Sequence, residues 1–476
     1  MTTTTATSWE TVIGLEVHCE LATRTKLFCG CPNIFGDDPN TNVCPVCLGL
    51  PGSLPVLNVN AVELAIRLGQ ALHCTVERSV FARKNYFYPD MPKDFQISQY
   101  DLPTNVDGHL DLPDGTRIGI ERAHIEEDTG KNTHVGGDGR IHGAEYSLVD
   151  YNRAGIPLVE IVSRPDLRGA DDAKDYVNEL RAILLATGAS DAKMEEGSMR
   201  VDANVSVRHI GDALGTRCEI KNLNSTRSLV HAIEHEAARQ VELIGAGERV
   251  RQETRHWDEA AGRTRSGRSK EEAEDYRYFP EPDLVPLDPD ADYVERIAAA
   301  LPLLPSDRRA RLASVSNGSQ GAVAIAVARG LDELAIAAIE AGGDSGRVLT
   351  HIEHNLAVEG AAALDPSSLA ALARMESEGA LTATQAKAVL AELVERGGDP
   401  EAIAKARGFE AMDASALDAS IDAAIAAEPD VWAKFVAGDD KAVGRLVGSV
   451  MKATSGKADG KAVTTKLQER RAAASG

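Results

Sequence analysis

Several segments of the sequence alternate between apolar and polar residues, and their polar positions hold side chains that can do chemistry. In TVIGLEVHCEL, the apolar Ile13, Leu15 and Val17 alternate with Glu16 and His18. Residues two apart on a strand share one face, so the pattern predicts a strand with an apolar and a polar side. A solvent-exposed sheet face without a binding site favours Lys, Thr, Ser and Gln, whereas a histidine between carboxylates is typical of a metal site.

Three more segments carry side chains of the same kinds. They contribute Arg200, Asp202 and Asn204 from MRVDANVSVRH, His124, Glu126, Glu127 and Asp128 from RIGIERAHIEEDTG, and Glu160 from IPLVEIVSRPD. Mg²⁺ prefers carboxylate oxygens and completes its shell with water and phosphate oxygens. Alternation alone also fits a solvated antiparallel sheet. The combination of His, carboxylate, Asn and Arg favours a concave polar sheet with a metal–phosphate site.

A separate cluster of cysteines predicts a second kind of metal site. Cys29, Cys31, Cys44 and Cys47 give C-x-C and C-x₂-C pairs, and the other three cysteines lie outside this pattern. Two close pairs on short turns can place four thiolates around one Zn²⁺, and such a closed site is structural rather than catalytic. Free thiols are the alternative.

The elements that must position these residues include helices as well as strands. Helical spacing occurs in NVNAVELAIRLGQALH, in ADDAKDYVNELRAILLATG, which ends at Gly188, and in TRSLVHAIEHEAARQVELIGAG. The absence of regular βαβ alternation predicts an α+β fold rather than a doubly wound sheet. A Pro-rich stretch follows residue 279, and Ala is abundant beyond about residue 300. We therefore expect a strand-rich domain up to about residue 295 and helices after it.

The net charge of −22 over 476 residues argues, taken alone, against a nucleic-acid partner. Residues 441–476 differ, because they hold eight basic and two acidic residues, a net charge of +6. They form either a solvated helix face or a surface for phosphates. The sequence has no Walker A motif and no GxGxxG after a strand, which disfavours P-loop and Rossmann enzymes. It shows no secretory signal and no 18-residue apolar run, so we expect a cytoplasmic protein without a membrane partner.

Long stretches of the chain match one family in order. They are TVIGLEVHCEL, CPVCLGLPGSLPVLN, RKNYFYPDMPKDFQISQYD, HIEEDTGK, SLVDYNRAGIPLVEIVSRPD, MEEGSMRVDANVSVR, EIKNLNS, QETRHWDE and DYRYFPEPDL, followed near the end by LVGSVMKATSGKAD. Together they closely resemble the B subunits of bacterial aspartyl/glutamyl-tRNA(Asn/Gln) amidotransferases, and the resemblance covers essentially the whole chain.

The resemblance implies a fold and an activity. The fold is a glutamine synthetase-like cradle on an antiparallel sheet in residues 1–295, a helical domain in 296–408 and a small helical tail domain in 409–476. The activity is that of a carbon–nitrogen ligase with glutamine as amido donor. ATP phosphorylates the side-chain carboxylate of Glu or Asp misattached to tRNA(Gln) or tRNA(Asn), and ammonia then replaces the phosphate. An amidase (glutaminase) subunit supplies the ammonia and a small third protein bridges the two, which makes a heterotrimer.

The resemblance also implies residue roles. Glu16, His18, Glu127 and Glu160 are the expected catalytic residues, the last three as Mg²⁺ ligands. Lys84 and Lys93 are expected to balance phosphate charge or to line the ammonia entry. The residues expected to contact nucleotide or acceptor end are Arg200, Asp202 and Asn204. The lysines expected to bind tRNA are Lys452, Lys457 and Lys461.

Simpler explanations stay open at this point. The alternation of side chains along a strand does not decide whether Glu126 or Glu127 faces the metal. Glu160 could form an ion pair with Arg153 or Arg164 instead. Lys84 could be a surface lysine beside aromatic residues. Two other functions compete: a zinc-stabilised tRNA-binding scaffold without chemistry of its own, and a ligase for a small molecule. The retained carboxylates and histidine argue against the first, and the basic tail argues against the second.

Overall fold

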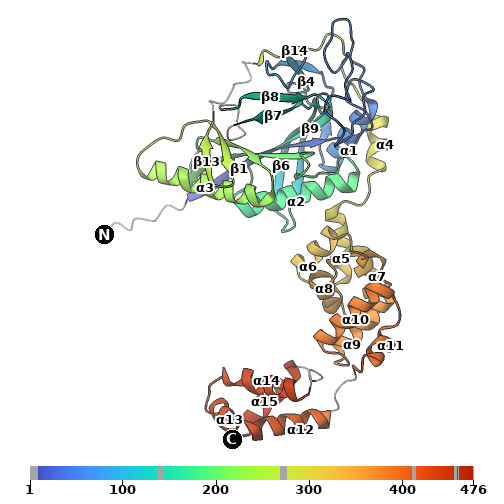
Figure 1. Ribbon diagram of the computed structural model, residues 1–476, viewed down its shortest axis with the longest axis vertical. Coiled ribbons are helices and arrows are strands. Elements are labelled where there is room, and N and C mark those ends of the chain that lie inside the picture. Colours follow the sequence, from blue (N-terminus) through green and yellow to red (C-terminus); the bar gives the residue numbers. More distant parts are fainter. Residues whose placement is uncertain are drawn as a thin grey trace. The chain divides into compact units, whose positions relative to one another are not determined.

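The computed structural model describes residues 9–136, 143–267, 276–409, 414–454, 458 and 460–474. The chain divides into two compact units, residues 1–306 and residues 307–476 (Figure 1). The strands lie in the first unit, and the elements found among the described residues of the second unit are helices. Within the described part of the chain, every helix is too short or too polar to span a lipid bilayer.

A 12-stranded sheet forms the centre of the first unit, in the order β13-β12-β11-β10-β1-β9-β6-β4-β3-β14, with β5 on β6 and β2 on β5. The pairs are antiparallel, apart from the parallel pair of β11 and β12. The strands are β1 (Trp9–Glu20), β2 (Thr75–Val76), β3 (Ala82–Asn85), β4 (Phe95–Ser98), β5 (Asn105–Asp111), β6 (Arg117–Glu127), β9 (Pro157–Ser163), β10 (Met199–His209), β11 (Cys218–Leu223), β12 (Thr254–Asp258), β13 (Arg263–Ser266) and β14 (Phe279–Pro280). A separate hairpin consists of β7 (Lys131–Val135) and β8 (Tyr146–Asp150).

Helices cover one face of this sheet. They are α1 (Val59–Ala71), α2 (Ala170–Thr187), α3 (Thr226–Gly245) and, packed on α1, α4 (Ala291–Ala299). In Figure 1, α2 and α3 run side by side along the sheet. Ile13 and Leu15 of β1 share one buried cluster with Ile66 of α1, Tyr176 of α2 and Leu229 of α3. Burying this apolar side stabilises the unit and leaves the other side of the strands to polar residues.

The helix ends follow the sequence signals. The α2 helix stops at Gly188, which has φ of 66° in the left-handed region where glycine carries no steric penalty. The predicted C-cap at Gly188 is thus confirmed.

The second unit holds two hydrophobic clusters, one between residues 312 and 404 and one between residues 417 and 467. Its helices are α5 (Pro305–Val315), which begins at the unit boundary, α6 (Gln320–Ala328), α7 (Asp332–Glu340), α8 (Ser345–His354), the 3₁₀ helix η2 (Ala361–Ala363), α9 (Pro366–Ser377), α10 (Ala383–Arg396), α11 (Pro400–Ala406), α12 (Ala414–Ala427), α13 (Pro429–Val436), α14 (Ala442–Ala453) and α15 (Gly460–Ala474). The expected fold class, mixed α+β with a mostly antiparallel sheet and then an all-helical region, is confirmed. Residue 295 lies inside α4, whose Ile297 is buried in the core of the first unit.

Candidate active site on the polar face of the sheet

Strand pairing brings three functional side chains into one row across the middle of the sheet. His18 of β1 lies opposite Glu160 of β9, and Glu160 lies opposite His124 of β6. Residues that are directly opposite in antiparallel strands face the same side. The row therefore places one carboxylate between two histidines on the polar face, and Glu126, two residues after His124, joins it from the same strand.

These side chains approach each other closely enough to share a cation. The Nε2 atom of His18 lies 3.7 Å from Oε1 of Glu126 and 3.7 Å from Oε2 of Glu160. One ligand atom from each of these three residues lies within 4.8 Å of the other two. His124 approaches from the other side, with Nε2 at 3.3 Å from Oε2 of Glu160.

The charges of this cluster are unbalanced without a cation. Burial and the nearby Glu160 carboxylate raise the pKa of Glu126 to about 8. Burial, together with the positive charges of Arg200, Lys221 and Lys84, holds the pKa of His18 well below its usual range. A neutral imidazole beside the buried carboxylate of Glu126 and the half-buried carboxylate of Glu160 is a donor set that suits a hard divalent cation, because the metal would remove the carboxylate repulsion. The residues present therefore fit Mg²⁺.

The neighbouring carboxylate Glu127, which the resemblance places among the metal ligands, points to the opposite face of β6, away from His18 and Glu160. Neighbouring residues on a strand face opposite sides, and Glu126 is the one that joins His18 and Glu160. Glu127 instead accepts hydrogen bonds from Nζ of Lys93 at 2.6 and 2.5 Å and from the backbone N–H of Ile97 at 3.0 Å. Lys93, expected beside phosphates, is thereby held on the same far side as Glu127.

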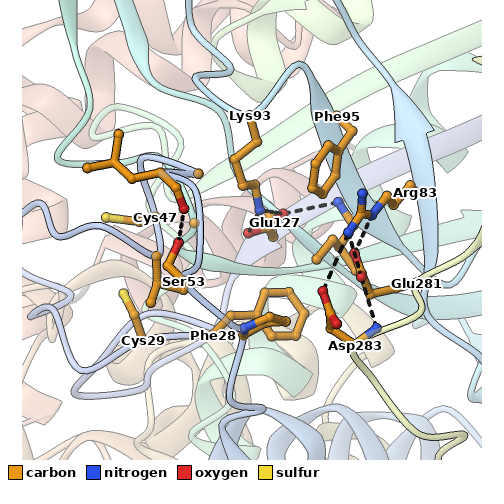
Figure 2. A pocket seen from close by; sticks show the side chains of 16 residues that line it. Phe28, Cys29, Cys47, Ser53, Arg83, Lys93, Phe95, Glu127, Glu281 and Asp283 are labelled. Atoms are coloured by element: carbon orange, nitrogen blue, oxygen red, sulfur yellow. Dashed lines mark hydrogen bonds and ion pairs between the residues drawn. The ribbon is translucent and has the colours of Figure 1, made fainter.

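The Lys93–Glu127 pair lines a cavity of about 210 Å³ (Figure 2). A second ion pair borders it, in which Arg83 donates to both carboxylate oxygens of Glu281 at 2.6 and 2.8 Å. Figure 2 shows Phe95 between these pairs, Phe28 below them, and Cys29 and Cys47 on the side of the cavity away from Arg83. The cavity is thus amphipathic and lies between the cysteine cluster and the sheet.

The other predicted site residues of the first unit surround the cation cluster on the polar face. Lys84 of β3 lies over the ring of Tyr276 at 4.7 Å, and its charge reaches His18 and Glu126. Arg200 lies opposite His18 and pairs with Asp128 at 2.9 Å. These positive groups lie beside the carboxylates, where a phosphate would need them.

A polar group on β1, β10 and β11 continues this face. Nδ2 of Asn204 donates to Glu16 at 2.8 Å, and Lys221 pairs with Asp202 at 2.9 Å. Burial raises the pKa of Asp202, and the charge of Lys221 opposes that shift. Glu16 lies opposite Asp202 in the register and so shares its face. Glu16, Asp202 and Asn204 are therefore adjacent to the cation cluster but outside it.

The alternative partners proposed for Glu160 bind elsewhere. Arg164 pairs with Asp107 at 2.5 Å, and Arg153 approaches Asp128 at 3.4 Å. Glu160 is left to the two histidines, which agrees with a place in the cation cluster.

The four predicted zinc ligands come together in the segment between β1 and α1. One sulfur from each of Cys29, Cys31, Cys44 and Cys47 lies within 4.8 Å of the others, and all seven cysteines of the chain are free thiols. The thiol of Cys29 and the backbone N–H of Cys44 donate toward Cys47 and lower its pKa to about 5, while burial acts in the opposite direction. Four sulfurs this close together, with Cys47 favoured as a thiolate, form a donor set that fits Zn²⁺.

Of the three predicted tRNA-binding lysines, Lys452 lies exposed in the last turn of α14. Lys457 lies outside the described residues, as does the side chain of Lys461.

Sequence reasoning did not assign roles to His124, Lys221 or Asp128, which the structure places in direct contact with the site. His124 had a usable signal, because it lies two residues before Glu126 and so shares its face. The pairing of Lys221 with Asp202 depends on a register shift between β10 and β11, which residue alternation does not reveal.

Sequence comparison relates the chain to known proteins. The family model described as the GatB/GatE catalytic domain matches residues 11–295, and the model described as the GatB domain matches residues 347–470. The B subunit of the aspartyl/glutamyl-tRNA(Asn/Gln) amidotransferase of Frankia casuarinae is 50% identical, and the match covers 97% of this chain and 95% of the relative. The proteins of the same name from Salinispora arenicola and Nocardia farcinica are 50% and 49% identical, with 97% and 95% of this chain covered and 96% and 94% of each relative. All of the cation cluster lies inside the segment that matches the catalytic domain, and the chain belongs to the family of aspartyl/glutamyl-tRNA(Asn/Gln) amidotransferase B subunits.

Proposed function

We propose that this chain amidates misacylated Glu-tRNA(Gln), Asp-tRNA(Asn) or both in an ATP-dependent reaction. The observation that carries the proposal is the group of His18, Glu126 and Glu160, which lies on the polar face of the sheet within the family's catalytic domain. A scaffold that only binds tRNA has no need of two carboxylates that lie this close together on one face of the sheet.

The reaction has two steps, because a carboxylate is a poor electrophile. In the first step, an oxygen of the aminoacyl side-chain carboxylate attacks the γ-phosphorus of ATP, and the bond from this phosphorus to the β–γ bridging oxygen breaks to release ADP. In the second step, the nitrogen of ammonia attacks the carbonyl carbon, the C–O bond to phosphate breaks, and a proton leaves the nitrogen. The products are the side-chain amide and inorganic phosphate. Phosphoryl transfer of this kind depends mainly on positioning and charge neutralisation.

The side chains of the polar face can meet these needs. A bound Mg²⁺, held by His18, Glu126 and Glu160, would neutralise charge on the transferred phosphoryl group. Lys84 and Arg200 lie beside that cluster and supply positive charge to phosphate oxygens. Glu16, Asp202 and Asn204 lie next to the cluster on the polar face, where they can orient the nucleotide or the acceptor end of the tRNA. We infer that the mostly antiparallel sheet is a glutamine synthetase-like cradle, whose polar face carries the substrates.

The family resemblance supports the remaining parts of the proposal. An amidase subunit would hydrolyse glutamine and supply ammonia, and a small third protein would bridge the two. Lys93, on the cavity side of the sheet, is a candidate for the ammonia entry. Zn²⁺ bound to the four cysteines would hold the segment between β1 and α1 in place. The lysines of the tail would bind tRNA. Aminoacylated tRNA and ATP are made in the bacterial cytoplasm, where we place the enzyme.

One assay tests the proposal. The chain is co-expressed with its amidase and bridging subunits and supplied with misacylated tRNA, ATP and glutamine, and amidated product is measured. We expect ATP-dependent product, and we expect Glu160→Gln to lower kcat/KM about 100-fold or more because a cation ligand is lost. Glu63→Gln on α1, which removes a carboxylate paired with Arg67, is the matched control and should be neutral. Product formation without ATP, or full activity of Glu160→Gln, would refute the proposed site.

A further inference from the structure

A second histidine, His124, contacts the cation cluster without belonging to it. Its side chain is fully buried, whereas that of His18 is 21% exposed. His18 reaches Glu160 from β1 and His124 reaches it from β6, so Oε2 of Glu160 lies between two Nε2 atoms at 3.7 and 3.3 Å. His124 is not one of the three residues whose ligand atoms converge.

The ring of His124 has an incomplete set of partners. Neither Nδ1 nor Nε2 has an aligned hydrogen-bond partner among the described residues. A buried polar atom without a partner costs on the order of 1–3 kcal/mol and calls for an explanation. Oε2 of Glu160 at 3.3 Å is within reach of Nε2, and hydrogen bonds that serve catalysis are often poorly aligned until the site is loaded.

The surroundings of His124 determine what its ring can do. The His124 side chain is enclosed, and its Nε2 faces Oε2 of Glu160 across the paired strands β6 and β9. An imidazole donates through its ring N–H, and the carboxylate of Glu160 on the facing strand is the acceptor within reach of Nε2. A proton on Nε2 cannot coexist with metal binding at that nitrogen, so the ring supports the carboxylate and does not ligate.

We propose that His124 is a positioning residue that donates from Nε2 to Oε2 of Glu160 and holds this carboxylate toward the cation shared with His18 and Glu126. Groups that hydrogen-bond a metal ligand from behind fix its orientation, and losing one typically weakens metal affinity about 10- to 100-fold. The inference rests on the cation site of the proposed function. It adds a residue on which the affinity and geometry of that site depend.

Two polar substitutions with side chains of different length test this role. In His124→Gln the amide nitrogen can occupy the place of Nε2, whereas in His124→Asn it reaches only the place of Nδ1. Mn²⁺ binding to the full chain is titrated by the electron paramagnetic resonance signal of free Mn²⁺. We expect His124→Asn to bind Mn²⁺ about tenfold more weakly than the wild type, and His124→Gln to stay within about threefold of it. His134→Leu on β7, a histidine whose contact is with Ser147, is the control and should bind normally.

The assembled enzyme gives a second readout that a purely structural role would not produce. In His124→Asn, the Mg²⁺ concentration needed for half-maximal amidation should rise about tenfold, while kcat at saturating Mg²⁺ stays near that of the wild type. Equal Mn²⁺ affinity of the Gln and Asn variants would overturn the proposal, as would a lowered kcat with an unchanged Mg²⁺ requirement. If the wild-type chain binds no Mn²⁺, the proposed cation site itself fails, which separates the two results.

Discussion

Two adjacent glutamates show how strongly local surroundings decide the role of a residue. Glu126 lies among like charges, and its pKa is raised to about 8 by burial and by Glu160. Glu127 has the same side chain but faces the other side, where Lys93 and a backbone N–H satisfy it. The first carboxylate is suited to binding a cation, and the second is already neutralised by one. We therefore propose that Glu126 binds the cation and that Glu127 stabilises the wall of the cavity.

Substituting each glutamate in turn should separate these roles. Glu126→Gln should abolish Mn²⁺ binding by the full chain with little loss of stability, because a carboxyl whose pKa is raised to about 8 is mostly protonated at neutral pH and an amide of the same size replaces it without loss of a charge. Glu127→Gln should keep Mn²⁺ binding but lower the free energy of unfolding by about 3 kcal/mol, because it leaves the buried Lys93 unpaired. Urea unfolding and Mn²⁺ titration of both variants make the comparison. The opposite pattern, with Glu127→Gln losing the cation, would refute this assignment.

The sequence predicts which side chains share a face better than it predicts which of them meet. Alternation in β1 and β10 correctly puts Glu16 with His18 and Arg200 with Asp202 and Asn204. In the segment HIEED, alternation does not show which residues face the polar side of the sheet, because Glu126 and Glu127 are both polar and both buried. Only the register of β6 against β9, which pairs His124 with Glu160, resolves this. Such pairing joins residues far apart in the chain, and alternation within a segment carries no information about it.

At the scale of elements, the segment between β1 and α1 is notable for its lack of long strands and helices. From residue 21 to residue 58 it contains turns, bends and isolated bridges, and the four cysteines lie within it. Phe35, Leu54 and Val56 of this segment are largely exposed, whereas Leu27 and Phe28 are buried in the core, so hydrophobic burial fixes only part of the segment. A metal bound to the thiols would supply the missing stabilisation, as in other small metal-dependent folds.

Removing the metal should therefore affect this segment and leave the sheet intact. Elemental analysis should find about one zinc per chain, and Cys44→Ser should lose it. In Cys44→Ser, hydrogen exchange of residues 29–55 should rise by at least about tenfold, while that of β1 and β10 stays unchanged. Cys74→Ala, which alters a buried cysteine outside the cluster, is the control and should retain zinc. A zinc-free wild-type chain with a protected segment would contradict the assignment.

The order of the strands exceeds what the sequence patterns predict. The α+β class, the helix ends and the polar strands follow from periodicity and glycine positions. The central place of β1, between β9 and β10, does not, since its partners lie well over a hundred residues away along the chain. A resemblance to a known family can supply this arrangement, whereas local propensity cannot.

At the scale of the whole chain, the distribution of charge is more informative than the total of −22. The basic residues 441–476 are partly neutralised within their own unit. Arg445 pairs with Glu428 at 2.6 Å, Lys466 with Asp418 at 2.9 Å, and Arg471 with Asp440 at 2.6 Å. These pairs tie α14 and α15 to α12 and to the residues just before α13 and α14, and they leave fewer positive charges for phosphates. Lys452, exposed at the end of α14, has no ion pair among the described residues.

Two residues of α14 therefore allow a matched test of tRNA binding by the tail. Lys452→Gln removes an unpaired positive charge, and Arg445→Gln removes one that already faces Glu428. If Lys452 contacts a phosphate, its loss should weaken tRNA binding by the assembled enzyme and reduce the slope of log affinity against log salt by about 0.7–0.9. Arg445→Gln should change the slope less, because its charge is already balanced. Filter binding from about 50 to 200 mM salt measures both slopes, with glutaminase activity of the amidase partner as the check on assembly. Equal slopes for the wild type and Lys452→Gln would show that Lys452 does not contact tRNA. A larger effect of Arg445→Gln would indicate that tRNA binds nearer to α12.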